Sequence, residues 1–155
     1  LLDWRNYSTV DTKNARFCSL FKGCSVLTSA PELPATKLAN DCYNSMFEDC
    51  TSLTDAPELK ATTLAAYCYF AMFYNCTKLS TVTMLAPSDQ ISKASYYCCL
   101  NWLYNAGTDE TVKSRTLKVM DEAACIELES NTKYLPDNWK KGAEGTTVLY
   151  ENNGK

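Results

Sequence analysis

The chain has 155 residues, 46% of them hydrophobic, and a formal net charge of −3 with acidic and basic residues mixed along its length. That length suits one domain, and that composition suffices for a continuous core. No basic patch indicates a nucleic-acid partner, and no apolar stretch is long enough for a membrane-spanning helix. The first residues lack the pattern of a signal peptide, so a piece of a longer protein is expected. The sequence contains no histidine, which removes the commonest general base and metal ligand.

A repeat of 26 residues dominates the sequence. Three blocks, which begin at Arg16, Cys42 and Cys68, align without gaps. Matches at this many positions indicate a repeat architecture, in which each unit buries its apolar side chains against its neighbours. The columns with the clearest recurrence are Phe21, Phe47 and Phe73; Cys24, Cys50 and Cys76; Leu27, Leu53 and Leu79; and Leu33, Leu59 and Leu85.

The repeat extends in both directions. Leu1, Trp4 and Tyr7 lie one period before three apolar positions of the first full block, so the N-terminus is expected to supply an earlier, degenerate strand. After Pro87 the spacing of equivalent residues rises from 26 to 30. This change predicts a four-residue insertion near positions 88–90.

Each full unit predicts one strand followed by one helix. In the second unit, Leu53–Leu59 is a short segment bounded by turn residues, as in the strand of a leucine-rich repeat. Pro31 and Pro57 stand in this strand column, and because proline removes a ladder donor, the strands are expected to be short. Leu64–Cys76 carries apolar residues in steps of about one helical turn, which favours a helix.

The residues after Gly107 leave the repeat. Arg115–Met120 predicts a strand, and Glu122–Ser130 predicts a helix with Asp121 as its N-cap. Leu135–Trp139 is expected to form a turn, and Thr146–Tyr150 a last strand. These elements are expected to form a cap over the open end of the core.

Together, the elements predict an α/β fold. We expect a leucine-rich-repeat-type solenoid, with parallel strands on one face and short helices on the other, closed by a C-terminal α+β cap. The predicted boundaries are residues 1–107 for the solenoid, with about four turns of the repeat and a degenerate first turn, and residues 108–155 for the cap.

The second unit, CYNSMFEDCTSLTDAPELKATTLA at Cys42–Ala65, resembles the BspA-type leucine-rich repeat. The resemblance covers residues 16–107, and the run Ser95–Leu103 is similar to the closing repeat of such proteins. That family occurs in surface proteins of gut and oral anaerobes, chiefly Bacteroidales, and in proteins of their phages. The resemblance implies a non-catalytic adhesion or protein-binding role at a cell or virion surface, and it implies no particular ligand.

The nine cysteines are interpreted as a buried ladder of small apolar side chains, because most of them recur with the unit. Columns of three cannot pair completely as disulfides, and no CxxC pair suggests a zinc site. Without histidine, a catalytic thiol is not expected. Glu32 and Glu58 are interpreted as part of a solvated strand edge rather than as paired acids for hydrolysis. No catalytic, metal-binding or cofactor-binding residue is predicted.

The outer positions of the predicted helices change from polar in the second unit to aromatic in the third and fourth. These aromatic residues are Tyr67, Phe70, Tyr74, Tyr97 and Tyr104. A patch of this kind must be covered or used. Three interpretations remain open, which are that the C-terminal cap folds over the patch, that the patch is a subunit interface, or that it binds a ligand such as a glycan by ring stacking.

The sequence therefore predicts a binding or adhesion module rather than an enzyme. It is expected outside the cell or at a cell surface, to recognise a protein or a glycan, and neither a nucleic-acid partner nor membrane insertion is expected. Self-association through the aromatic patch stays open. The alternatives are a structural or receptor-binding component of a phage virion, and a hydrolase. Candidate recognition residues on the strand face are Ser29, Glu32, Asp55, Glu58 and Thr81.

Overall fold

The computed structural model describes residues 16–152. The predicted strand at Leu1, Trp4 and Tyr7 lies outside these residues. The fold is α/β, with an open sheet of three parallel strands in the order β1-β2-β3. The strands are β1 (Thr81–Met84), β2 (Arg115–Val119) and β3 (Thr146–Tyr150), and the helices are α1 (Ser88–Ile91), η2 (Ala94–Tyr96), α2 (Glu122–Glu129) and η3 (Asp137–Trp139).

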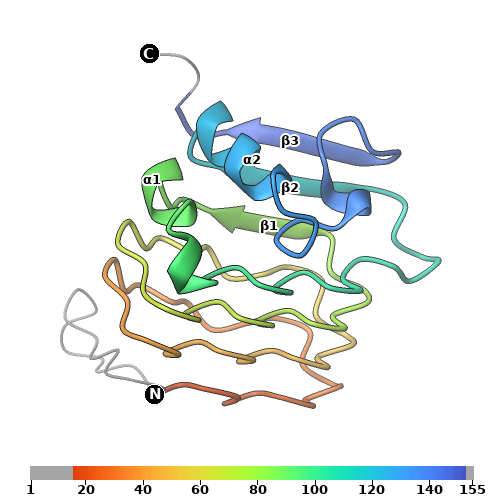
Figure 1. Cartoon of the computed structure of the whole chain (residues 1–155). Coiled ribbons are helices and arrows are strands. Elements are labelled where there is room, and N and C mark those ends of the chain that lie inside the picture. Colours follow the sequence, from red (N-terminus) through yellow and green to blue (C-terminus); the bar gives the residue numbers. More distant parts are fainter. Residues whose placement is uncertain (1–15, 153–155) are drawn as a thin grey trace.

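Residues one period apart lie side by side, and the units follow one another from the N-terminal to the C-terminal end (Figure 1). Single parallel bridges join Ser29 to Asp55 and Asp55 to Thr81. Thr81 is also the first residue of β1, which pairs with β2. A regular strand forms first at β1, where Thr83 replaces the proline of the earlier units. The prediction that Pro31 and Pro57 keep their strands short is therefore confirmed.

The leucine column differs from the prediction at its third member. Leu59 pairs with Met84 instead of standing one full period before Leu85. Met84 is fully buried, whereas Leu85 is half-buried. Between these two bridges the second unit advances four residues, from Asp55 to Leu59, whereas β1 advances three, from Thr81 to Met84. The extra residue of the second unit lies around Pro57, which cannot donate to a ladder.

The helix predicted over Leu64–Cys76 and its equivalents is wrong. Residues 17–24, 41–50, 67–76 and 97–106 instead form extended ribbons of consecutive turns, here called the turn ribbons. In the second ribbon, the N–H groups of Asn44, Met46 and Glu48 each donate to the carbonyl three residues earlier, at 3.2 Å. The inward positions recur every four residues, whereas an α-helix repeats every 3.6.

The remaining N–H groups join each turn ribbon to the next. Tyr43, Ser45 and Phe47 donate to carbonyl oxygens of the third ribbon at 3.2, 2.8 and 2.9 Å, and Tyr69 donates to Cys98 of the fourth at 2.9 Å. The first three ribbons thus direct alternate N–H groups to the carbonyls of the ribbon that follows. Unlike a helix, a turn ribbon satisfies its backbone only when a neighbour is present.

A left-handed backbone at every fourth residue makes this conformation possible. The second ribbon has positive φ at Asp41, Ser45 and Asp49, with values of 55°, 53° and 61°. Asp, Asn, Ser and Gly are the residues that enter this region at least cost, because they lack a bulky side chain or hydrogen-bond to nearby backbone. Seven of the ten non-glycine residues with positive φ in the described chain are Ser, Asp or Asn. The sequence therefore favours ribbon over helix at these positions.

The core lies between the turn ribbons and the strand segments. Phe47 stacks on Phe21 and on Phe73 with ring centroids 5.5 and 5.7 Å apart. The thiols of Cys50 and Cys76 donate hydrogen bonds to the carbonyls of Phe21 and Phe47 in the preceding unit, at 3.1 and 3.0 Å. Ring columns and buried thiol donors therefore hold successive units in one register.

The C-terminal elements pack on the end of the fourth ribbon. The predicted strands are confirmed as β2 and β3, the predicted insertion contains α1, and the predicted helix is α2, whose N-cap Asp121 accepts a bond from the Ala124 N–H at 2.9 Å. The predicted turn contains η3, whose Trp139 is fully buried and donates from Nε1 to the Ala106 carbonyl at 3.1 Å. One core cluster of buried residues runs from the repeats into these elements.

Candidate functional site

Five aromatic residues gather on the outer side of the third and fourth turn ribbons, and we call them the aromatic face. Tyr67 stacks on Tyr97 at 5.7 Å and Tyr74 on Tyr104 at 4.7 Å, while Phe70 meets Tyr67 edge-on at 5.8 Å. Tyr67, Tyr97 and Tyr104 are 37%, 45% and 53% exposed. The structure thus forms two ring clusters on these ribbons, one of Tyr67, Phe70 and Tyr97 and one of Tyr74 and Tyr104.

Within each tyrosine pair, stacking covers one ring face of each member. The interplanar angles are 23° for Tyr67 with Tyr97 and 17° for Tyr74 with Tyr104, so each ring covers one face of its neighbour. A glycan that stacks on an aromatic residue needs an open ring face. Stacking within each pair therefore halves the ring faces left for a sugar, while the phenol hydroxyls can still donate or accept hydrogen bonds.

A ladder of polar side chains supports the face. Asn75 donates to Asp49 at 2.9 Å, and Asn105 donates to Asn75 at 3.0 Å. These three residues share a column with positive φ, and Asn75 and Asn105 directly follow Tyr74 and Tyr104. The ladder fixes the backbone that carries the outer tyrosine pair, so the face is ordered before any partner arrives.

Tyr67 and Tyr97 stand in a backbone conformation that tyrosine disfavours. Their φ values are 54° and 45°, in the column where the second unit has Asp41. The left-handed conformation costs an ordinary L-residue roughly 1–2 kcal/mol. Among the described non-glycine residues with positive φ, only Ala71 shares their lack of a small polar side chain. Strained residues of this kind cluster at functional sites, and both tyrosines lie on the exposed face.

The C-terminal cap does not cover these residues. It meets the end of the fourth ribbon, where the Asn101 N–H donates to the Lys133 carbonyl at 2.7 Å and Trp102 donates to the Tyr134 carbonyl. Tyr97 and Tyr104 remain among the exposed large hydrophobic residues. The interpretation that residues 108–155 fold over the patch is wrong for Tyr67, Tyr97 and Tyr104, because these side chains stay exposed in the described chain.

The strand-face residues form two neighbouring groups. Ser29, Asp55 and Thr81 are joined by parallel bridges, and the first two are exposed. Glu32 and Glu58 are exposed and line one groove together with Lys60, whose ammonium lies 3.5 Å from the Glu58 carboxylate. The five predicted positions therefore share one surface.

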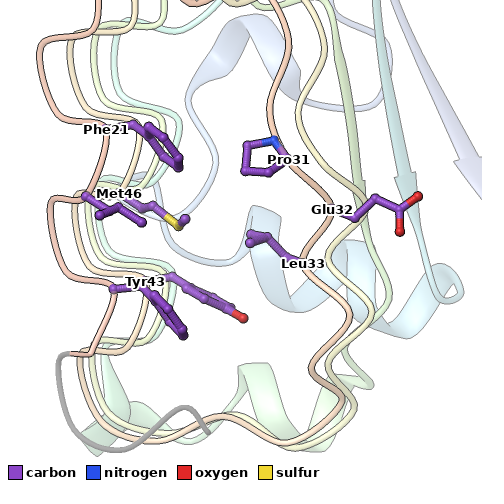
Figure 2. Close-up of a pocket in the computed structure, with 8 residues that line it drawn as sticks. Phe21, Pro31, Glu32, Leu33, Tyr43 and Met46 are labelled. Atoms are coloured by element: carbon purple, nitrogen blue, oxygen red, sulfur yellow. The ribbon is translucent and has the colours of Figure 1, made fainter. Parts of the chain in front are cut away.

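Figure 2 shows the inner side of the same strand segment. Phe21, Tyr43 and Met46 of the turn ribbons point toward Pro31 and Leu33, whereas Glu32 points away from them. The alternation along this segment separates core residues from surface residues. It supports the interpretation of Glu32 as part of a solvated edge.

Three buried cysteines, Cys42, Cys50 and Cys125, offer little reactivity. All nine cysteines are free, and Cys42, Cys50 and Cys125 are buried. Burial raises the pKa of Cys42 from 9.0 to about 12, and the pKa values of Cys50 and Cys125 to about 11. These thiols therefore stay protonated and poorly nucleophilic at neutral pH.

Residues 16–152 contain no group of three or more Cys, Asp or Glu side chains placed to hold a metal ion. Within the same residues, no helix has the length and apolar character needed to cross a membrane. No protein-family model, curated protein or solved structure matches the chain. Functional argument therefore starts from the surfaces just described.

Proposed function

We propose that this chain is a non-catalytic binding module of the BspA-like leucine-rich-repeat type, acting outside the cell or at a cell surface. The 26-residue repeat, its resemblance to that family and the side-by-side packing of successive units support this proposal. The proposed architecture is a short solenoid in which turn ribbons take the place of helices. A stack of this kind provides broad, rigid surfaces for macromolecular contact.

The observation that carries the proposal is the pair Tyr67 and Tyr97. Both adopt left-handed backbone, both are exposed, and they stack on each other. A sequence selected only for folding stability would have Asn, Asp or Gly at these positions, as the second unit has Asp41. Tyrosine at both positions lowers local stability and enlarges an exposed aromatic surface, which a binding role explains.

The proposed partner of the aromatic face is a protein. Tyrosine supplies large contact area at low conformational cost and is favoured at protein interfaces. The phenol hydroxyls of the stacked pairs can also donate to backbone carbonyls and carboxylates of a partner. A second copy of the chain is one such protein.

The test uses the double variant Tyr74→Ser/Tyr104→Ser, which removes one exposed stack at positions without positive φ. The control is Ile126→Ser, because Ile126 is 59% exposed but lies on α2, outside the face. Wild-type protein is screened against purified extracellular proteins, and light scattering measures self-association. We expect a partner, or self-association, that the double variant loses by at least about tenfold in affinity and the control retains. A partner bound equally by both variants would contradict the proposal.

A further inference from the structure

A second surface lies on the strand side, between the second and third units and the loop that precedes β2. It is a polar groove lined by the hydroxyl side chains of Thr54, Ser80, Thr111 and Ser114, with Lys78 and Lys113 at its border. Val112 is the remaining, apolar lining residue. None of these residues belongs to the aromatic face or to the predicted strand-face set.

The groove is held in shape by hydrogen bonds of its own backbone. Ser80 donates to the Thr54 carbonyl from both its N–H, at 2.8 Å, and its hydroxyl, at 3.1 Å. On the other side, Asp109 accepts from the Thr111 N–H at 2.9 Å and from the Thr111 hydroxyl, and its carbonyl accepts from the Val112 N–H at 2.9 Å. Both walls are therefore preorganised.

Two ammonium groups remain available in this groove. Lys78 and Lys113 are exposed, and neither makes an ion pair within residues 16–152. Lys78 acts on Asp109, whose pKa is lowered first by its bonds from Thr111 and further by the charge of Lys78. Asp55, which follows the lining residue Thr54, accepts a bond from the Thr54 hydroxyl at 2.8 Å. Both carboxylates are engaged by hydroxyl groups of the groove itself.

We propose that this groove binds an acidic saccharide, with Lys78 and Lys113 holding a carboxylate or sulfate group and the hydroxyl side chains pairing with sugar hydroxyls. Lysine binds such anions as a point charge without demanding one orientation. The hydroxyls of Thr54, Ser80 and Thr111 already donate within the protein, so their oxygens serve as acceptors for sugar hydroxyls, while the Ser114 hydroxyl can donate or accept.

The lining favours a saccharide over an acidic peptide. Six of the seven lining residues are polar, whereas protein hot spots are centred on aromatic or aliphatic anchors in well-packed pockets. Val112 alone supplies no such pocket. The position also leaves the aromatic face free, so one chain could hold an acidic glycan on its strand side and a protein on its ribbon side.

The test measures binding by calorimetry to four defined probes of similar length. They are a sulfated heparin hexasaccharide, a hexagalacturonate, neutral maltohexaose and hexaglutamate. We expect one or both acidic saccharides to bind, with sulfate and carboxylate as the sources distinguished, and maltohexaose and hexaglutamate to bind at least about tenfold more weakly. Equal binding of maltohexaose, equal binding of hexaglutamate, or no binding of either acidic saccharide would overturn the proposal.

Variants locate the site. Lys78→Gln and Lys113→Gln should each weaken binding about fivefold, equivalent to about 1 kcal/mol, and Lys78→Arg should retain most of it. The matched control is Lys133→Gln, an exposed lysine outside the groove. Surface substitutions of this kind leave folding nearly unchanged, which thermal unfolding verifies. If Lys133→Gln weakens binding as much as the groove variants, the attraction is general charge and the site is refuted.

Discussion

Ala71 provides a direct test of the turn ribbons. Its φ is 49°, and its side chain is 5% exposed. Ala71→Gly should relieve a left-handed backbone while removing one buried methyl. Ala61→Gly is the matched control, because Ala61 is 1% exposed and is not among the residues with positive φ.

The two substitutions have the same effects on the free energy of unfolding except for one, the relief of the left-handed backbone at Ala71. Glycine costs about 0.4–1 kcal/mol through the entropy of the unfolded chain, and loss of one buried methyl costs about 0.8 kcal/mol. Ala61→Gly should therefore lower the free energy of unfolding by about 1–2 kcal/mol. At Ala71 the relief of roughly 1–2 kcal/mol offsets that loss, so Ala71→Gly should lie close to wild type.

Urea unfolding at equilibrium, with equal m-values for the three proteins, measures this difference. We expect Ala71→Gly to be about 1–2 kcal/mol more stable than Ala61→Gly. Equal destabilisation by both would show that Ala71 is not left-handed. The reasoning would then fail for the whole ribbon, since every ribbon uses the same four-residue pattern.

Three further predictions concern the thiols and the cap. Cys18 is exposed whereas Cys24 is half-buried and the other seven are buried, so a thiol reagent at pH 8 should modify one cysteine rapidly and all nine only on unfolding. Because burial raises the pKa of Cys42 from 9.0 to about 12, the Cys42 thiol ionises at a lower pH in the unfolded state than in the folded state. The contribution of this thiol to the free energy of unfolding should be fully present below pH 9. Above pH 9 the free energy of unfolding should fall by about 1.4 kcal/mol per pH unit for each such thiol, until the pH reaches the folded pKa. Urea titration under reducing conditions measures this fall. Asp121→Ala should lower the free energy of unfolding by about 1 kcal/mol through loss of the α2 N-cap, while Asp121→Asn should retain most of it.

The repeat and the C-terminal elements were accessible from sequence because each depends on local signals. Period 26 identified the neighbouring units, the change of spacing after Pro87 identified the insertion that forms α1, and Asp121 marked the start of α2. Proline in the strand column predicted short strands, since the missing donor acts locally. The shift of Leu59 onto Met84 depends on pairing across units, which no single unit encodes.

The turn ribbons were missed because their inward positions, two in every four, resemble a helical stripe over one or two turns. Two signals separate the alternatives. Each inward column recurs at a strict spacing of four, as at Cys68, Met72 and Cys76, whereas a helical stripe repeats every 3.6 residues. In addition, Ser, Asp, Asn or Gly occupies most of the left-handed column, as at Ser45, Asp49 and Asn75. The same column reveals Tyr67 and Tyr97 as exceptions. The groove at Lys78 and Lys113 gives no comparable signal, because the loop that brings Lys113 to Lys78 lies outside the repeat.

The most direct test of the proposed binding role compares affinity and stability in the double variant Tyr67→Asn/Tyr97→Asn. Asparagine accepts the left-handed backbone, which offsets the roughly 0.5–1.5 kcal/mol lost with the ring stack. We predict that the partner's affinity falls at least about tenfold while the free energy of unfolding stays within about 1 kcal/mol of wild type. Unchanged affinity in a folded variant would contradict the proposal that the aromatic face is the binding surface.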